Sequence, residues 1–361
     1  MKKLIGILAG MAVIAAGVWF YKAENKPVEA GSKPVVKIGV MYPLSGELAS
    51  MGNAGKIGIE VAKQKIDKMD TKYDYEFIFE DNQFNNAKSA SVLNKFLNVD
   101  KIDVLIDSGA GVGNVSSPIM EKNKLIHFNW SSDPNVAKGK YNFINWTQPP
   151  AQAEKMAKVI KNKGYQNIWI VTANHAGPIA VTEGLAKELS NENIAYNVKK
   201  FNIGSRDMRM DIREISESKA DLIVIVLFDP DLSIFLKQLK ELDVHTDLTA
   251  IEVFSFLENP SVVEGSWYID AAEGDNEVTD EVRRRTGSNV ILGASNSYDI
   301  VMLLVKAFET AATKEQAVDE LLKIKNYKGY TGDLAQDENG IFQSEAIVKV
   351  IKDGKPIVIE E

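Results

Sequence analysis

VVKIGVMYPLSGELASMGNAGKIGIEV, residues Val35–Val61, sets the architecture of the chain. Its first eight residues form an apolar run with little polar interruption, which predicts a strand buried on both faces. Pro43 and Gly46 end this strand, and the apolar residues that follow have helical spacing. A strand, a polar loop and a helix form half of a βαβ unit, and α/β sheets bind ligands at the carboxyl ends of such strands. The loop Ser45–Asn53, which contains Met51, is therefore the first expected wall of a binding site.

Predicted strands and helices continue to alternate after this stretch. The alternating pattern occurs twice, and the two copies are separated by a break near Asn145–Pro150. Alternation of this length is typical of βαβ units around a parallel sheet. We therefore expect an α/β fold with two similar lobes, each a parallel-sheet, Rossmann-like α/β/α sandwich. The expected strands after the first are Tyr75–Glu80, Ile102–Ile106, Leu125–Phe128, Asn167–Thr172, Tyr196–Phe201, Leu222–Phe228 and Leu248–Val253, and the helices between them are Asn86–Leu97, Ser116–Lys122, Ala151–Lys163, Ile179–Leu189, Met208–Ser216 and Asp231–Leu242.

The length and charge of the chain limit its function. A chain of 361 residues can form two domains with substantial cores. Its formal net charge is −8, whereas nucleic-acid-binding proteins usually carry a basic face. We therefore expect no nucleic-acid partner.

The N-terminus predicts export. Two lysines precede the uncharged apolar segment Leu4–Phe20, as in a signal peptide. The small residues in Val28–Ala30 allow cleavage before Gly31, but the apolar segment also approaches the length that spans a bilayer. Residues 1–34 are thus either a cleaved signal peptide or an N-terminal membrane anchor, followed by a tether. Because the chain has no cysteine, lipid modification of an N-terminal cysteine and disulfides are excluded. We expect a periplasmic or extracellular protein.

A glycine-rich turn follows the third expected strand. Gly109, Gly111 and Gly113 come directly after Ser108, but the third glycine is one residue early for a dinucleotide-binding G-x-G-x-x-G motif. A tight turn that exposes backbone N–H groups at a helix N-terminus fits better, and such a turn can hold any small anion.

The histidines do not indicate a metal site. None of His127, His175 and His245 is paired with another at i+3 or i+4, so a zinc site is not expected. His127 lies in an apolar strand and is most simply buried and hydrogen-bonded. His175 lies in a loop after a strand and is better placed for a ligand. No G-x-S-x-G elbow is present, and we expect no catalysis and no cofactor.

Glu252 is the most informative single residue. It lies at an apolar strand end, where an unpaired buried carboxylate would cost several kcal/mol or raise its pKa. It either points to the surface or is aimed into a cleft, where it would meet a ligand ammonium. Asp229 is a weaker candidate, because it equally suits the start of a helix. Trp130, Phe228 and Tyr298 belong either to the core or to a site where aromatic rings stack on a ligand or face a cation.

The chain resembles the periplasmic binding proteins of the branched-chain amino acid (Leu/Ile/Val) type. The resemblance covers nearly all of the chain after Lys33. It rests on motifs that occur in this order: Ile38-Gly39-Val40 with Pro43-Leu44-Ser45-Gly46 and Gly52, Glu80-Asp81-Asn82-Gln83, Ser131-Ser132 ahead of Pro134, Asp221–Pro230 with Glu252, and Gly329–Leu334 with Asp337–Gly340.

The resemblance implies two lobes that are joined by three crossovers and close around a ligand. The implied first lobe comprises residues 35–146 and 272–327, and the implied second lobe comprises 151–268 and 333–361. The crossovers would lie near residues 145–150, 267–271 and 328–333. Closure requires the ligand to bind the closed state better than the open state.

The resemblance also implies a site for an amino acid. Ser132 and the Trp130 backbone would hold a carboxylate, Glu252 an ammonium, and Phe228 would be the cleft aromatic. The chain departs from the family at Gly109-Ala110-Gly111, where amino-acid binders have hydroxyls, and at His175-Ala176, where they have an aromatic residue. We hypothesise an amine-bearing solute with an apolar or aromatic body. The expected ligand-binding residues are Met51, Ser108, Gly109, Gly111, Trp130, Ser131, Ser132, His175, Phe228, Asp229, Glu252 and Tyr298.

By this resemblance the protein would be a monomer that delivers a small-molecule solute, an amino acid or a related amine or amide, to a membrane ABC permease. The alternative is a sensory receptor domain of the same fold that signals to a membrane partner. A doubly wound enzyme is a third class, but the sequence shows no nucleophile elbow, paired histidines or correct phosphate loop for it.

Overall fold

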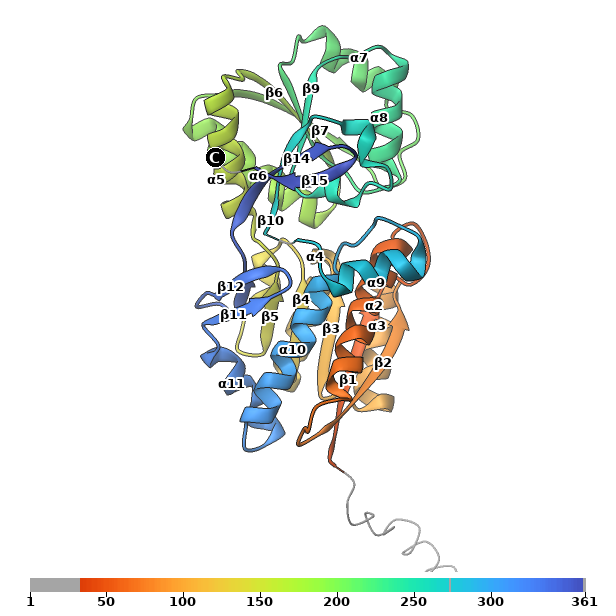
Figure 1. The fold of residues 1–361 in the computed structure, drawn as a ribbon, viewed down its shortest axis with the longest axis vertical. Helices are drawn as coiled ribbons and strands as arrows, with labels where there is room; N and C mark the ends of the chain where they lie inside the picture. Colours follow the sequence, from red (N-terminus) through yellow and green to blue (C-terminus); the bar gives the residue numbers. More distant parts are fainter. Residues whose placement is uncertain (1–32, 273, 360–361) are drawn as a thin grey trace, which may run out of the picture.

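The computed structural model describes residues 33–272 and 274–359, which form two lobes stacked one above the other (Figure 1). The expected signal peptide or anchor at residues 1–34 lies outside the described residues, except for its last two. Within the described ranges, no helix has the length and apolar character to cross a membrane.

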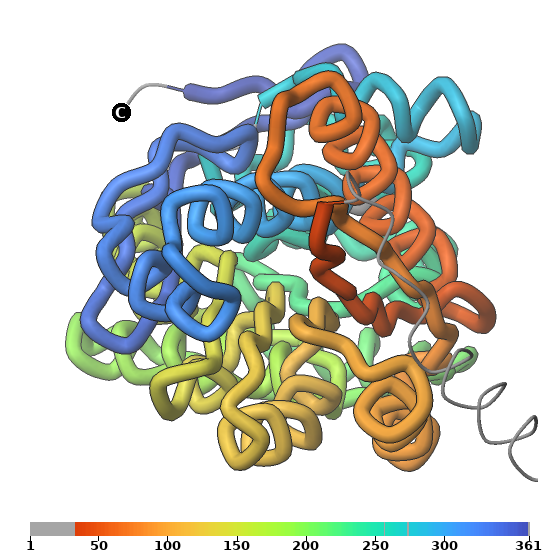
Figure 2. The backbone as a smooth tube through the Cα atoms, turned by 90° about the horizontal axis from the view of Figure 1, so that it is seen from below, coloured from red at the N-terminus to blue at the C-terminus, as the bar shows by residue number. Residues whose placement is uncertain are grey.

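The first lobe is built on a mixed, largely parallel sheet of eight strands, in the order β11-β12-β13-β5-β4-β3-β1-β2. Figure 2 shows α2 and α10 on one side of its strands and α3 and α4 on the other. The strands are β1 (Val35–Tyr42), β2 (Asp74–Asp81), β3 (Val104–Ser108), β4 (Ile126–Trp130), β5 (Asn142–Asn145), β11 (Asn326–Gly329), β12 (Gly332–Gln336) and β13 (Ile341–Gln343). The helices are α2 (Ala49–Ile66), α3 (Asn86–Lys95), α4 (Ala110–Asn123), α9 (Glu277–Thr286), α10 (Ala294–Thr310) and α11 (Ala317–Lys323), with short turns η1 (Phe96–Asp100), η2 (Pro134–Ala137) and η5 (Lys314–Gln316).

The second lobe contains a parallel sheet, in the order β7-β6-β8-β9, and a smaller antiparallel sheet, in the order β10-β14-β15. A single bridge between Ile251 and Ile269 links the two sheets. The strands are β6 (Asn167–Ala173), β7 (Ala195–Phe201), β8 (Leu222–Val226), β9 (Asp247–Ala250), β10 (Trp267–Ala271), β14 (Ala346–Lys352) and β15 (Lys355–Val358). The helices are α5 (Pro149–Lys163), α6 (Ala176–Asn191), α7 (Arg209–Glu217) and α8 (Asp231–Glu241), with turns η3 (Val253–Phe256) and η4 (Pro260–Val263).

The central strands have the burial that their sequence predicts. Val36, Ile38 and Val40 of β1 are fully buried, and β3, β4 and β8 are buried along their whole length. This is the pattern of parallel strands that helices cover on both faces. The two-lobe α/β architecture expected from the sequence is confirmed.

The first turn of α4 was not expected as helix. The sequence predicts a helix from Ser116, but α4 begins at Ala110, directly after Gly109. Gly109 has φ +84°, a left-handed conformation that glycine adopts without steric cost and that lets the strand turn at once into the helix. The small residues after it gave no apolar period, although Ala110, Val112 and Gly113 are buried.

The third expected crossover, near residues 328–333, is wrong. This segment lies in the hairpin of β11 and β12, which turns at Gly332 with φ +107°. β13 then pairs in parallel with β5, so residues 333–343 complete the first sheet instead of joining the second lobe. The chain passes to the second lobe between β13 and β14, at Ser344. The second passage follows β10, which is itself a strand of the second lobe.

Candidate functional site

The two main sheets point their carboxyl ends toward one another. The first sheet reverses its strand order between β1 and β3, and the second reverses it between β6 and β8. Such points leave a crevice outside the strand ends, where α/β proteins bind ligands. The crevice here encloses a cavity of about 70 Å³ between the lobes, which we call the cleft cavity. Its lining comprises Met51, Phe84, Gly109, Ala110, Trp130, Ser131, Ser132, Trp146 and Leu292 with His175, Gly177, Pro178, Val181, Val226, Phe228, Ile251, Glu252 and Val253.

Most of the residues expected to bind a ligand therefore lie around one cavity. Those that line it are Met51, Gly109, Trp130, Ser131, Ser132, His175, Phe228 and Glu252. They come from strand ends and the segments that follow them in both lobes, as the alternation of strands and helices predicted. The expected loop Ser45–Asn53 is wrong in its second half, because α2 begins at Ala49 and carries Met51 in its first turn.

Four expected residues do not line the cleft cavity. Ser108 is fully buried at the end of β3. Gly111 lies just behind, where an added Cβ would be 3.3 Å from His175 Nε2. Asp229 accepts hydrogen bonds from the N–H and Oγ of Ser233 and so stabilises the start of α8. Tyr298 stacks against another tyrosine and accepts a hydrogen bond from Lys65 in the body of the first lobe.

Glu252 follows β9 in an unusual backbone conformation. Its φ of 65° and ψ of −42° place it outside the strand that the sequence predicted. The backbone N–H of Glu252 donates to Ile269 O at 2.7 Å, which fixes the turn against β10. Its carboxylate accepts a hydrogen bond from Gln152 Nε2, and the Trp146 indole N–H faces it without completing a hydrogen bond to any described residue.

The charge of Glu252 is set by burial. The residue is 9% exposed, and this desolvation, together with the nearby Asp270 carboxylate, raises the pKa of Glu252 to about 8. The hydrogen bond from Gln152 and the facing indole N–H of Trp146 lower the pKa of Glu252 and so offset only part of this effect. Without a cation beside it, the side chain is therefore mainly protonated at neutral pH. A ligand ammonium would supply the missing positive charge.

Trp130 forms a rigid wall on the first lobe. Its indole N–H donates to Tyr42 OH at 3.1 Å, and that hydroxyl lies 2.8 Å from Ser297 Oγ. The Trp130 ring also stacks on Trp146, with 6.0 Å between ring centroids. Next to this wall, Ser131 Oγ is buried and has no hydrogen-bond partner in the described part of the chain. An unused hydroxyl beside a cavity is available to a ligand oxygen.

His175 supplies the opposite wall. It lies between Phe84 and Phe228, at ring-centroid distances of 5.0 Å and 6.4 Å. Burial lowers the pKa of His175, so the imidazole is neutral at physiological pH. Its Nδ1 makes no hydrogen bond with a described residue. The side chain can therefore offer a ligand both an aromatic face and a nitrogen.

The two lobes are closed over the cavity. A Cβ on Gly177, in the first turn of α6, would lie 3.1 Å from Ser132 Oγ of the first lobe. At the mouth, Arg206 Nη2 of the second lobe donates to Glu47 Oε1 of the first at 2.6 Å. Contacts on both sides of the cavity thus depend on the angle between the lobes.

Sequence reasoning missed several lining residues. Phe84 follows the polar cluster at the end of β2. Leu292 lies just before α10, and it does not follow a strand, so the strand-end rule did not predict it. Trp146 lies in the first crossing segment, which was expected to be a connection only. Gln152 does not line the cavity, but it is fully buried on the inner face of α5 and holds Glu252. A glutamine among Ala153, Met156 and other inward-facing residues was the available signal.

No metal centre accompanies these side chains. Within residues 33–272 and 274–359, no group of three or more His, Asp or Glu side chains is arranged to hold a metal ion.

The chain was compared with protein families, curated proteins and solved structures. A family model described as periplasmic binding protein matches residues 35–355. No curated protein sequence matches the chain.

Several solved structures share the fold. The leucine-binding protein LivK of Thermotoga maritima MSB8 has a TM-score of 0.78 and 20% identity, covering 90% of this chain and 98% of its own. An ABC transporter solute-binding protein of Rhodopseudomonas palustris BisB5, in complex with 3,4-dihydroxybenzoic acid, has a TM-score of 0.81, 14% identity and coverage of 91% and 96%. LivJ of Streptococcus pneumoniae, in complex with isoleucine, has a TM-score of 0.77, 19% identity and coverage of 91% and 100%.

Proposed function

The chain belongs to the periplasmic binding protein family, and from that premise we propose that it captures a small amino-acid-like solute between its lobes and delivers it to an ABC importer. The solute class is an amine with an apolar or aromatic body. The solved relatives include proteins that bind leucine or isoleucine, which supports this class.

The observation that carries the proposal is the composition of the cleft cavity. Glu252, buried on the second lobe, faces a cavity whose other wall holds Ser131 and Ser132. Trp130 and Phe228 supply flat apolar surfaces from opposite lobes. A solute with an ammonium, a carboxylate and an apolar group would use each of these features. Because it would contact both lobes, it would bind the closed state better than the open state.

A carboxylate without an amine is a second candidate solute. Glu252 with a pKa of about 8 is mainly a carboxylic acid at neutral pH and can itself donate a hydrogen bond. The Ser131 hydroxyl and the N-terminus of α4 add further donors. The relative from Rhodopseudomonas palustris, which is in complex with a dihydroxybenzoic acid, supports this class.

Calorimetry on Glu252→Gln separates the two candidates. If the solute is an amine, the variant loses the partner of the ammonium, and we expect affinity to fall about 10- to 100-fold, since hydrogen bonds to charged groups contribute about 1.5–3 kcal/mol. Solute binding should also release close to one proton at pH 7, which is measured by repeating the titration in buffers of different ionisation enthalpy.

Glu183→Gln is the matched control, because Glu183 is an exposed carboxylate on α6 outside the cavity. It should leave affinity unchanged. If Glu252→Gln also leaves the affinity for the cognate solute unchanged and no proton is released, the amine assignment fails and the carboxylate candidate takes its place.

Transport and sensing differ in the partner of the closed form. A permease and an ATPase encoded beside this chain would support delivery to an importer. A neighbouring kinase or regulator, with unchanged solute uptake in cells that lack this protein, would instead support the alternative of a sensory domain.

A further inference from the structure

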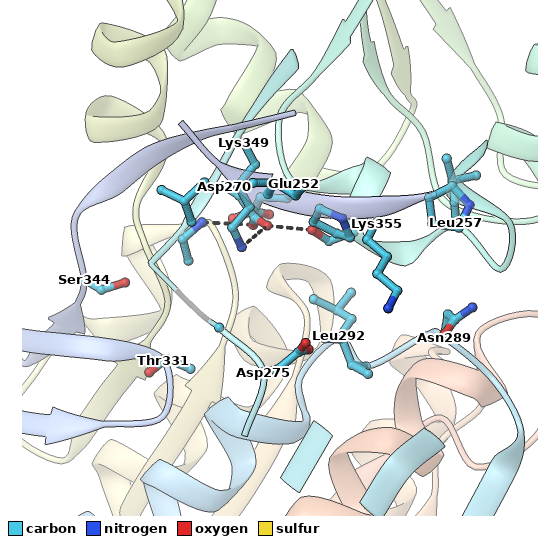
Figure 3. A pocket seen from close by; sticks show the side chains of 18 of the residues that line it. Glu252, Leu257, Asp270, Asp275, Asn289, Leu292, Thr331, Ser344, Lys349 and Lys355 are labelled. Carbon is cyan, nitrogen blue, oxygen red and sulfur yellow. Dashed lines mark hydrogen bonds and ion pairs between the residues drawn. The ribbon is translucent and has the colours of Figure 1, made fainter. Parts of the chain in front are cut away.

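A second, larger cavity lies on the other side of Glu252. It has a volume of about 870 Å³ and lies beside all three passages between the lobes, where it is lined by Asn145–Thr147, by Asp270–Ala271 at the end of β10, and by Ser344. β14 and β15 pass over it from the second lobe (Figure 3). We call it the hinge-side chamber.

The hinge-side chamber adjoins the cleft cavity. Trp146, Glu252 and Leu292 line both. Glu252 therefore lies at the junction, with the small apolar and aromatic cleft cavity on one side and, on the other, a larger chamber that also presents charged and amide side chains. A cation bound at Glu252 can carry substituents in both directions.

The volumes of the two cavities argue for joint use. Sites for small molecules usually measure roughly 300–1,000 Å³. The cleft cavity, at about 70 Å³, falls well below this range, whereas the hinge-side chamber, at about 870 Å³, falls within it. The cleft cavity alone is thus too small for a typical ligand, and most of the available space lies in the hinge-side chamber.

Several buried polar side chains line one side of the hinge-side chamber. Lys349 Nζ and Ser255 Oγ both donate to Asp270 Oδ2, at 2.9 Å and 2.6 Å, and Asp270 and Lys349 are each more than nine-tenths buried. Asn145 is 1% exposed, and its Nδ2 has no hydrogen-bond partner among the described residues. A buried N–H without an acceptor is costly, so its place in the lining points to a ligand acceptor.

A cation also reaches into the hinge-side chamber. The Lys355 side chain extends from β15 toward Leu292 and Asn289 (Figure 3). Lys355 forms no ion pair with any residue in the described ranges. With Asn145, it offers two positions for oxygen atoms of a ligand.

We propose that the solute straddles Glu252, with its α-ammonium at this carboxylate, an apolar side chain in the cleft cavity and a polar arm with oxygen acceptors in the hinge-side chamber. The class that fits is an α-amino acid amide or short peptide with an apolar first residue. Its first carbonyl would meet the donors of Ser131 and Ser132, and its terminal carboxylate would meet Lys355. This inference rests on the proposed capture of an amine.

Calorimetry with leucine, leucinamide and leucyl-glycine tests the inference on the full-length protein. We expect leucyl-glycine to bind at least tenfold more tightly than leucine, and leucinamide to fall between them. Lys355→Gln should weaken leucyl-glycine binding about three- to tenfold and leave leucine binding unchanged. Lys187→Gln, which removes an exposed lysine on α6 remote from the hinge-side chamber, should change neither.

The outcomes separate this inference from the proposed function. Leucine binding more tightly than leucyl-glycine overturns the straddling solute and leaves amine capture in place. A tenfold preference for leucyl-glycine that survives Lys355→Gln removes the role of Lys355 and overturns the assigned arm position. Failure of all three compounds at millimolar concentration overturns both proposals.

Discussion

The backbone at Glu252 adopts φ 65° and ψ −42°, a region that residues with a Cβ rarely occupy. Such strain is usually found where surrounding structure holds a functional side chain in place. Here the turn is held by Ile269 O and by Gln152, so the carboxylate stays at the junction of the two cavities. The molecule keeps an acid in a place where ionisation is unfavourable without a partner.

This arrangement predicts a pH dependence of stability. Because the folded-state pKa of Glu252 is about 8, against an ordinary 4.5, the native state binds a proton that the unfolded state releases. The stability associated with Glu252 is complete below about pH 4.5 and is lost as the pH rises through 8. Glu252→Gln should therefore be more stable than the parent at pH 8.5, by on the order of 3 kcal/mol, and the difference should vanish near pH 5. Denaturant unfolding at both pH values measures this, and an equal difference at both would contradict it.

His127 is a second buried titratable residue, at the centre of the first sheet. Its Nε2 lies 2.8 Å from Asp107 Oδ1 and its Nδ1 lies 2.9 Å from Asn142 Oδ1. The amide nitrogen of Asn142 donates to Lys138 O and Glu121, so its oxygen must face the ring. Both ring nitrogens therefore donate, and the ring is an imidazolium. The expectation that His127 is buried and hydrogen-bonded is confirmed.

His127 gives a separate stability prediction. Burial lowers the pKa of His127, but Asp107 and Asn142 outweigh it and hold the pKa above the ordinary value of 6.5. The stability that it contributes is complete below pH 6.5 and is lost as the pH rises through the folded pKa. His127→Gln leaves Asp107 buried without its cation, so we expect a loss of about 3–5 kcal/mol at pH 6 and a smaller loss at pH 9. Chemical denaturation checks this, and the same loss at both pH values would refute it.

At the residue scale, the sequence predicted those site residues whose side-chain type suits ligand binding and which also lie at the end of a strand. Glu252, Ser131 and Trp130 each follow an apolar strand, and strand ends meet at one edge of a parallel sheet. Gln152 and Phe84 were missed because they reach the site through tertiary packing, which no local pattern records. Tyr298 does not line the cleft cavity, and apolar character alone does not tell which face of a buried helix meets a cavity.

At the scale of elements, α2 and α10 pack through bare backbone. A Cβ on Gly58 would lie 2.0 Å from Ala294 O, and one on Gly55 would lie 3.0 Å from Ser297 Oγ of α10. The two helices therefore approach more closely than side chains would allow, and this packing fixes the first turn of α2, which carries Met51.

Two glycine-to-alanine changes in helices should act in opposite directions. Gly58→Ala forces α2 away from α10, and overpacking of this kind costs about 1–3 kcal/mol or more. Gly184→Ala on α6 meets no atom closer than 3.5 Å, so it should stabilise by up to about 1 kcal/mol through helix propensity. Thermal unfolding of both variants gives the comparison. A neutral Gly58→Ala would show that the helices can separate freely.

The strands between residues 326 and 343 were the least predictable elements. β11, β12 and β13 are short and partly exposed. They form strands because they extend the first sheet next to β5, which lies far away in the sequence. The alternation of strands and helices along the sequence does not predict a pairing between strands that are so far apart in the chain. The elements of the second sheet, in contrast, follow one another directly, and all were expected.

At the scale of the whole molecule, one ion pair spans the mouth of the closed cleft. Glu47 and Arg206 are about half exposed, and Arg206 also pairs with the buried Asp231. Glu47→Gln removes the ion pair between Glu47 and Arg206, while Arg206 keeps its ion pair with Asp231. Exposed pairs contribute about 0.2–1 kcal/mol, so we expect solute affinity to fall no more than about fivefold.

Salt tests whether this pair acts across the mouth. The difference between Glu47→Gln and the parent should be largest at low ionic strength and should disappear near 1 M salt, where charges are screened within roughly 3 Å. Glu60→Gln, which breaks a pair within the first lobe, is the control and should not alter affinity. A salt-independent difference for Glu47→Gln would mean that the side chain acts by packing.

The pairing of β13 with β5 has a consequence for synthesis of the protein. The four strands of the second sheet leave the ribosome in one uninterrupted stretch, so that sheet can assemble early. β5 is made before them, yet its outer edge has no strand to cover it until Ile341 has been translated. Open edges of this kind recruit other chains. Nascent chains that are arrested before residue 341 should therefore be the species that aggregates or that holdase chaperones retain, whereas chains that end beyond residue 343 should escape.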